Sequence, residues 1–367
     1  MIDHLELRNF KCFREQTIPF RGLTILAGLN GSGKSSVIQA ILALRQALGA
    51  ERGTPWQGSL VNLGSYRDVI HEDASDDTVG LKVSFGGEAQ ARFEMRQQGE
   101  AGEAWCGPEA EKQLRGYLFY VSADRLGPRA TLPFAGDGQR SSLAPLGKRG
   151  EHVLWYLHNF GGAPVMAAVR HPGESKNTLV AQATAWLGAI SPGADPMIAV
   201  VPEADCAVVT YRFSRSGDVP SRPFRASNVG FGVSYAFPPI VALLAPKRDR
   251  TSSVEHLVII ENPEAHLHPG GQTSLAELAA RATASGSQVV LETHSDHVLD
   301  GVRLAVREGI LSPEEVAIHY FERYGLDVRV TTPVVSRTGR LDIWPEGFFD
   351  QHERNLSRLM GLPNTTG

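Results

Sequence analysis

The spacing of hydrophobic and polar residues along this chain predicts a mixture of strands and helices. Residues 2–7 alternate apolar and polar side chains, which is typical of a half-buried strand. Residues 36–48 instead repeat apolar side chains at helical spacing, which predicts a helix with one buried face. Short apolar runs, which predict buried strands, occupy residues 23–27, 117–121, 256–260 and 287–292.

Weaker patterns complete this outline. Residues 79–85 and 91–95 predict two strands of an antiparallel accessory sheet, joined by a glycine pair, and the polar residues 97–107 predict a flexible connection. Phe10 and Phe13 flank the turn after the first strand and are expected in the core. Further strands are predicted at residues 198–201, 207–213, 318–323 and 328–331, and further helices at residues 151–160, 179–190, 235–244 and 347–360.

Residues 28–35 carry the chemistry that is easiest to identify. Their sequence, GLNGSGKS, matches G-x-x-x-x-G-K-[ST], in which backbone N–H groups surround phosphates, the lysine contacts the β- and γ-phosphates and the last hydroxyl binds Mg²⁺. A predicted strand precedes this loop and a predicted helix follows it, so the phosphate would lie at a helix N-terminus. The expected nucleotide-binding residues are Asn30, Gly31, Ser32, Gly33, Lys34, Ser35 and Ser36.

Composition limits the partners of the protein. The chain has 367 residues, 42% hydrophobic and 21% charged, and its length suits about two domains or one elaborated α/β unit. A formal net charge of -4 argues against a basic surface over the whole protein, so any DNA contact would be local. Three distant cysteines, an odd number, argue against a disulfide framework. The sequence shows neither a secretory signal nor an apolar run of membrane length, so we expect a cytoplasmic protein.

A second group of polar residues follows the later buried strands. Glu261 ends the strand predicted at residues 256–260, which is the Walker B arrangement that places a carboxylate beside the P-loop to hold the Mg²⁺ shell. His294 follows the next predicted strand, and Ser295 has the features of a helix N-cap. In this order after a P-loop, His294 is predicted to contact the γ-phosphate. Metal binding is not expected at a histidine pair that lacks further ligands nearby, His266 and His268.

Other charged residues permit two interpretations each. Asp124 and Arg125 follow a buried strand, where α/β folds place functional groups, yet an ion pair of Asp124 with Arg125 or Arg129 explains them equally well. Arg8 and Lys11 either face nucleotide phosphate or are solvated, and the solvated interpretation is favoured. A solvated face is also favoured over a DNA or partner contact for the basic segment that contains Arg212, Arg215, Arg222 and Arg225.

Together these motifs resemble a known family. The segment RNFKCF (residues 8–13), the loop GLNGSGKS, the segment IIENPEAHLHP (259–269) and the segment ETHSDHVL (292–299) are similar to the ABC-type AAA ATPases of the SMC/RecF/OLD class. The chain looks most like small bacterial members that end in a short C-terminal domain of unknown function, here WPEGFFDQHERNL (344–356). Residues 131–221 carry little of the resemblance.

The resemblance implies a fold and a composite ATP site. The expected fold is α/β: a P-loop ABC-type ATPase head with a mixed central sheet, an antiparallel accessory sheet, a helical insertion and no long coiled coil. In that family two heads meet head to tail, and each nucleotide lies between the P-loop of one chain and the signature loop of the other. The matching segment here is residues 227–234, in which Gly230 and Gly232 would let backbone N–H groups approach the γ-phosphate; an ordinary glycine-rich turn is the alternative.

The implied cofactors are ATP and Mg²⁺, and three departures from the family pattern affect their chemistry. Asn262 occupies the position of the usual catalytic glutamate, and an amide is no general base, so Glu264 is the expected substitute. The Walker B carboxylate is Glu261 instead of aspartate; Ser35 and Glu261 are the expected metal-binding residues. No long coiled-coil arms are predicted, and the residues after His294 are too few for a further nuclease domain.

The resemblance leads to one main functional expectation and several alternatives. The main expectation is a slowly hydrolysing Mg·ATPase with Lys34, Glu261, Glu264 and His294 in the catalytic site, which dimerises on ATP and drives a separately encoded effector in bacterial anti-phage or genome defence. The alternatives are a RecF-like DNA repair ATPase that binds DNA directly and an ATP-gated scaffold or sensor; a small-molecule kinase is disfavoured. The expected parts are an N-terminal ATPase lobe (1–130), a helical insertion (131–222), a C-terminal ATPase lobe (223–335) and a short C-terminal domain (336–367).

Overall fold

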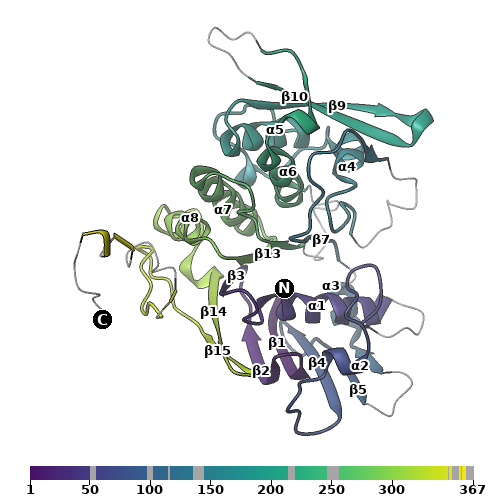
Figure 1. Cartoon of the computed structure of the whole chain (residues 1–367), viewed down its shortest axis with the longest axis vertical. Helices are drawn as coiled ribbons and strands as arrows, with labels where there is room; N and C mark the ends of the chain where they lie inside the picture. The colour runs from purple at the N-terminus through teal and green to yellow at the C-terminus, as the bar shows by residue number, and fades with distance from the viewer. Residues whose placement is uncertain are drawn as a thin grey trace.

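Three β-sheets and the helices packed between and around them make up this computed structural model (Figure 1). Its central layer is a six-stranded sheet in the order β15-β14-β3-β13-β12-β7. The strands β14, β3, β13, β12 and β7 are parallel, and β15 is antiparallel to β14. The structure describes residues 1–49, 55–96, 102–114, 116–134, 144–213, 220–245, 256–345, 347–348, 355–356 and 358–360.

The central strands are parallel because helices connect and cover them, and their near-continuous apolar sequences follow from burial on both faces. β3 has the sequence LTILAG and β12 the sequence LVIIE, and most of their side chains are fully buried. The strand bounds are β3 (Leu23–Gly28), β7 (Leu118–Val121), β12 (Leu257–Glu261), β13 (Gln288–Thr293), β14 (Val316–Tyr324) and β15 (Asp327–Thr331).

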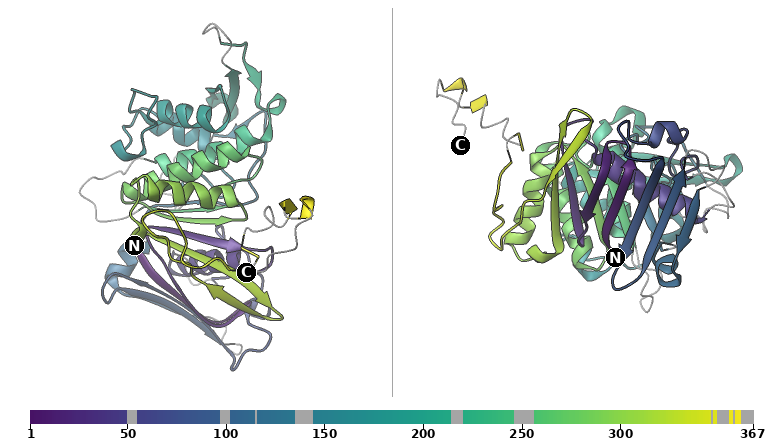
Figure 2. Two further views of the ribbon diagram at one scale, coloured as in Figure 1. Left: turned by 90° about the vertical axis from the view of Figure 1, so that its left-hand side faces the viewer. Right: turned by 90° about the horizontal axis from the view of Figure 1, so that it is seen from below.

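An antiparallel sheet in the order β2-β1-β4-β5-β6 forms a second layer, and helix α1 (Lys34–Gly49) packs between it and the central sheet (Figures 1 and 2). Its inner face alternates with an outer polar face, as in β5, where every second residue is buried. The bounds are β1 (Ile2–Phe10), β2 (Phe13–Pro19), β4 (Thr78–Phe85), β5 (Gln90–Arg96) and β6 (Glu103–Cys106).

The opposite face of the central sheet is covered by helices that share one large apolar core (Figure 1). Helices α6 and α7 contact the strands of the sheet and α8 packs against α7, whereas α4 and α5 pack beyond them with a small sheet in which β10 pairs with β9, β8 and β11. The helices are α4 (Val153–Phe160), α5 (Leu179–Ile190), α6 (Phe231–Leu244), α7 (Pro269–Ala284) and α8 (Asp296–Arg307), and the strands are β8 (Leu132–Pro133), β9 (Ala194–Val201), β10 (Cys206–Phe213) and β11 (Phe224–Arg225).

Short elements and the C-terminal segment complete the chain. The segment after β15 runs beside α8, where the Arg303 side chain donates to the carbonyl of Gly339 and stacks over the Trp344 ring (Figure 2). No helix within the described residues is long and apolar enough to cross a bilayer. The short helices are α2 (Tyr66–Val69), α3 (Pro108–Leu114), η2 (Ala167–Val169), η3 (Pro202–Ala204), η4 (Ala226–Asn228) and η5 (Pro313–Glu315).

The expected fold class is confirmed, including the mixed central sheet and the antiparallel accessory sheet. Phe10 and Phe13 are buried as predicted. The flexible connection predicted at residues 97–107 is wrong in part, because residues 103–106 form β6 and pair with β5. Half of the helix predicted at residues 347–360, and Arg215, lie outside the described residues.

The Gln288 side chain ties the first strand to the central sheet. Its amide donates to the carbonyls of Ile2 and Arg21 and its oxygen accepts from the Ile2 N–H; the two bonds with Ile2 are buried and the bond with Arg21 is partly buried. We expect Gln288→Met to lower the free energy of unfolding in urea by about 2 kcal/mol or more, because it leaves these buried backbone groups unpaired. Gln16→Met, which removes one exposed bond to the Thr17 carbonyl, should change it by less than about 0.5 kcal/mol. Equal effects of the two changes would contradict this role.

Candidate functional site

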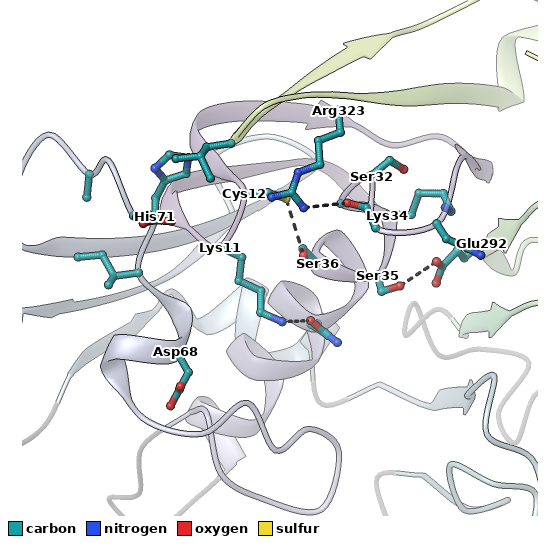
Figure 3. A pocket seen from close by; sticks show the side chains of 18 of the residues that line it. Lys11, Cys12, Ser32, Lys34, Ser35, Ser36, Asp68, His71, Glu292 and Arg323 are labelled. Carbon is teal, nitrogen blue, oxygen red and sulfur yellow. Dashed lines mark hydrogen bonds between the residues drawn. The ribbon is translucent and has the colours of Figure 1, made fainter. Parts of the chain in front are cut away.

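A cavity of about 1010 Å³ opens at the carboxyl ends of the central strands, above the P-loop (Figure 3). Every residue predicted to bind nucleotide from the P-loop lines it: Asn30, Gly31, Ser32, Gly33, Lys34, Ser35 and Ser36. Glu261 and His294 line it as well. The predicted strand, loop and helix order is confirmed, since the loop connects β3 to the N-terminus of α1.

The P-loop has the form of an anion cradle. Gly31 and Gly33 have φ values of 74° and 105°, and a Cβ on Gly33 would lie 2.8 Å from the Cys12 sulfur, so the loop requires glycine there. The Lys34 ammonium donates to the carbonyls of Gly28 and Leu29, at 2.9 and 2.7 Å. These weak backbone partners keep the cation in the cavity, where a phosphate would replace them.

Two buried carboxylates lie side by side beneath the P-loop. β12 and β13 pair in parallel with Glu261 opposite Glu292, so their side chains point to the same face of the sheet, toward α1. The Ser35 hydroxyl donates to the Glu292 carboxylate at 2.8 Å. Glu261 instead accepts from the Tyr120 hydroxyl at 3.2 Å and from the Ala123 N–H at 3.0 Å. Thus Glu292, and not the predicted Glu261, contacts the P-loop serine.

The environment of these carboxylates disfavours their charge. Burial, followed by the negative charge of Glu261, raises the pKa of Glu292 to about 7. Burial also raises the pKa of Glu261, against the hydrogen bonds from Ala123 and Tyr120. Lys34, whose own pKa burial lowers, offsets only part of this cost. The site therefore has more buried negative charge than its lysine neutralises.

Asn262 and Glu264 form hydrogen bonds with groups at the end of β13. Asn262 has φ of 45°, a left-handed conformation that asparagine tolerates better than glutamate, and its N–H donates to the Glu292 carbonyl. The Glu264 carboxylate accepts from the Thr293 hydroxyl at 2.8 Å and from the His294 N–H at 2.7 Å. Glu264 does not line the cavity. The predicted substitute base thus has both oxygens engaged.

His294 directly follows β13 and lines the cavity. Ser295 caps α8 as predicted, because its hydroxyl accepts from the Val298 N–H. Desolvation of the ring, followed by the positive charge of Lys34, lowers the pKa of His294. The imidazole is therefore neutral at pH 7 and has one N–H to donate to a phosphate.

Arg125 connects the strand edge to helix α6. Its buried guanidinium donates to the carbonyls of Glu261, Asn262 and Tyr235 and lies 5.2 Å from the Tyr235 ring. Of the two interpretations of Asp124, the ion pair with Arg125 or Arg129 is wrong in its partner, because Asp124 pairs with Arg149 at 3.1 Å. The carbonyls at the strand end attract Arg125 because they have no ladder partners there.

The signature-like segment, residues 227–234, does not reach the cavity of its own chain. Gly230 is the exposed N-cap of α6, without a side-chain cap, so the positive end of this helix is open to solvent. The two glycines of the segment differ. A Cβ on Gly230 would meet nothing within 4 Å, whereas one on Gly232 would lie 2.5 Å from the His266 carbonyl oxygen.

Sequence reasoning missed Glu292 and the outer wall of the cavity. Glu292 has the same sequence feature as Glu261, a carboxylate at the end of a buried strand. The prediction for that strand end instead assigned a role to His294, two residues later. Lys11 lines the cavity and bonds Gln39, whereas Arg8 does not line it and pairs with Asp76, which does. The remaining wall comes from segments that sequence alone does not connect with the P-loop, and it includes Arg67, Asp68, His71 and Arg323.

The site fits a magnesium nucleotide. The Ser32 hydroxyl is buried in the cavity wall without a hydrogen-bond partner among the described residues, and Lys34 and the open glycine loop offer positive groups for phosphates. Ser35 and the carboxylates offer the oxygen ligands that Mg²⁺ prefers. Within the described residues there is no group of three or more His, Cys, Asp and Glu side chains arranged for a metal ion, so phosphate oxygens would have to complete the shell.

Comparisons with known proteins agree with this geometry. Residues 4–104 match a family model described as "AAA domain", and residues 166–300 match one described as "AAA domain, putative AbiEii toxin, Type IV TA system". Residues 311–359 match a family described as "Protein of unknown function (DUF3696)". A stretch of 89 residues is 36% identical to the chromosome partition protein Smc of Gloeobacter violaceus; it covers 24% of this chain and only 7% of that protein.

Solved structures show the same fold. An SMC head bound to the C-winged helix domain of ScpA has a TM-score of 0.56 and 15% identity, covering 91% of this chain and 98% of that chain. An Smc head domain with an extended coiled coil from Pyrococcus furiosus, bound to the C-terminal domain of ScpA, has a TM-score of 0.53 and 13% identity, covering 98% of this chain and 99% of that chain. The fold is that of an SMC head.

The raised pKa of Glu292 predicts how stability depends on pH. Between pH 4.5 and about 7 the folded protein keeps a proton that the unfolded chain has released, so stability is full below this window and falls as pH rises through it. We expect Glu292→Gln to remove this loss, with a gain over the wild type of roughly 1–3 kcal/mol at pH 8 and little at pH 4.5. Urea unfolding at both pH values, without nucleotide or Mg²⁺, measures the difference. A constant difference would contradict the assigned pKa.

Proposed function

We propose that this chain, an SMC-like protein of the ABC-type AAA family, binds Mg·ATP in the P-loop cavity, dimerises on the nucleotide and controls a partner protein. The proposal rests on one observation: a single chain holds only half of the expected ATP site in its cavity. The cavity gathers Lys34, Ser35, two buried carboxylates and His294, whereas the signature-like segment lies exposed elsewhere on the same chain. A second copy of the chain would supply that segment.

Each residue at the cavity has a role in this proposal. Lys34 leaves the two loop carbonyls and stabilises charge on the β- and γ-phosphates. Ser35 and Glu261 help to hold Mg²⁺, and neutral His294 donates to the γ-phosphate. Glu264 orients water only after it is released from Thr293 and His294, which makes turnover slow.

The segment 227–234 would complete the site in trans. Gly230 presents the uncapped N-terminus of α6 to solvent, and such a helix end attracts a phosphate. Phe231, next to it, is 53% exposed, so it would be buried on association. Gly232 would act differently, because its lack of a side chain lets α6 approach the His266 carbonyl.

The proposed partner protein is inferred from the similar solved structures. The two SMC heads above are described as bound to domains of ScpA, a separate protein. We propose that this chain likewise acts on a separately encoded effector, such as a nuclease, in bacterial anti-phage or genome defence. The toxin–antitoxin description of the family matched by residues 166–300 supports a defence role. We also propose the division of the chain into two ATPase lobes, a helical insertion and a short C-terminal domain, with boundaries at residues 130, 222 and 335.

A second function is favoured by the geometry of Asn262 and Glu264. Asn262 has no acidic group, and the Glu264 carboxylate is outside the cavity with both oxygens engaged. ATP would then hold two copies together without being consumed, in a scaffold or sensor. Phosphate release at background level from dimers that form with ATP would establish this alternative, and steady turnover would exclude it.

Loss of the Lys34 cation tests nucleotide binding. Lys34→Ala should weaken ATP binding about 10- to 150-fold, because a charge-assisted contact to phosphate is lost. Titration with a fluorescent ATP analogue measures the affinity, and phosphate release should fall to background. Lys112→Ala, at an exposed site on α3 remote from the cavity, should leave both unchanged. Full ATP binding by Lys34→Ala would refute the site.

The exposed Gly230 tests the composite site. Gly230→Arg should leave folding and ATP binding by the P-loop unchanged, because the position is open and its φ of -61° suits any residue, but it should abolish the ATP-dependent dimer seen by light scattering. A mixture of Gly230→Arg with Lys34→Ala should regain hydrolysis, because one intact P-loop then meets one intact signature segment. ATP-dependent dimers of Gly230→Arg, or no recovery on mixing, would contradict the arrangement in trans.

A further inference from the structure

Glu292 is a buried carboxylate that lines the cavity, and it has no individual role in the function proposed above. We propose that Glu292 is the principal protein carboxylate of the Mg²⁺ shell, and that Glu261, whose oxygens accept from Tyr120 and Ala123, has a secondary part in holding the metal. This assignment rests on the proposed binding of Mg·ATP. It differs from the pattern in which the Walker B carboxylate alone serves the metal, because the acidic group at the P-loop serine comes from the next strand.

The contact with Ser35 is the first argument. In a P-loop the last hydroxyl binds Mg²⁺, so a carboxylate within hydrogen-bond distance of that hydroxyl also lies at the metal shell. The Glu292 Oε1 atom accepts from the Ser35 Oγ atom at 2.8 Å, and Figure 3 shows the two side chains pointing toward each other. Glu292 is only 5% exposed and lines the cavity, so it is fixed at this place.

The contacts of Glu261 are the second argument. Its Oε1 atom accepts from the Tyr120 hydroxyl and its Oε2 atom from the Ala123 N–H, so both oxygens already have donors from the β7 side of the sheet. Burial raises the pKa of Tyr120, so its hydroxyl stays protonated and keeps donating. Glu292 has one such contact, with Ser35 itself, and its other oxygen has no hydrogen-bond donor among the described residues.

The strand order explains why the nearer carboxylate comes from β13. This strand lies directly between the P-loop strand β3 and β12, so Glu292 is one strand closer to Ser35 than Glu261 is. A second and independent feature of the cavity also requires a ligand, since the buried Ser32 hydroxyl lines it without a hydrogen-bond partner among the described residues. Two buried carboxylates in register beside an unpaired hydroxyl are costly unless a cation and phosphates satisfy them.

The experiment measures ATP affinity with excess Mg²⁺ and with EDTA, by titration of a fluorescent ATP analogue. Glu292→Gln keeps the size of the side chain and a hydrogen-bonding group for Ser35 but removes the charge. We expect its ATP affinity in EDTA to equal that of the wild type. The increase in ATP affinity that Mg²⁺ causes should be roughly 10- to 100-fold smaller in this variant than in the wild type. Glu261→Gln should lose less of that gain. Glu292→Asp, which keeps the carboxylate, should be intermediate.

Controls separate the possible failures. Glu88→Gln, an exposed carboxylate at the β4–β5 turn, should keep the full Mg²⁺ gain. A Glu292→Gln protein that keeps the Mg²⁺ gain but loses phosphate release would overturn the assignment and make Glu292 a catalytic base. A larger loss in Glu261→Gln than in Glu292→Gln would also overturn it. No ATP binding by the wild type would instead refute the proposed function, and the assignment with it.

Discussion

The in-register parallel pairing of β3, β13 and β12 is the constraint on which the site depends. Because parallel strands end at the same edge of a sheet, this pairing brings the P-loop, Glu292 and Glu261 together although they are far apart in the sequence. A shift of one residue in either pair would turn one carboxylate to the opposite face, into the helical core. The apolar packing of α1 on one face and α7 and α8 on the other holds the register in place.

Local patterns were enough to predict the P-loop, the strand before it, the helix after it and the cap of α8, since each of these depends on neighbouring residues. Sequence did not identify the carboxylate that contacts Ser35, because the answer depends on strand order. Nothing in the segment 287–292 says that it lies between the other two strands. The same holds for Asp124, whose partner Arg149 comes from a distant loop.

The structure gives a second reason for asparagine at position 262, where the resembled family usually has a catalytic glutamate. From sequence, an amide at this position is only a missing base. In the fold it is also a residue with φ of 45° whose N–H bonds the carbonyl of Glu292, so its type suits the backbone as well as the chemistry. Restoring an acid there would add strain to a loop that also supports the second carboxylate.

Arg125 has a mechanical consequence for the whole head. One buried guanidinium bonds the carbonyls of Glu261 and Asn262 at the end of β12 and the carbonyl of Tyr235 in the first turns of α6. Arg125 therefore ties the strand edge beneath the P-loop cavity directly to the helix that carries Gly230. Because the same side chain bonds both elements, a displacement of α6 relative to the loop at Asn262 would have to break or stretch these hydrogen bonds.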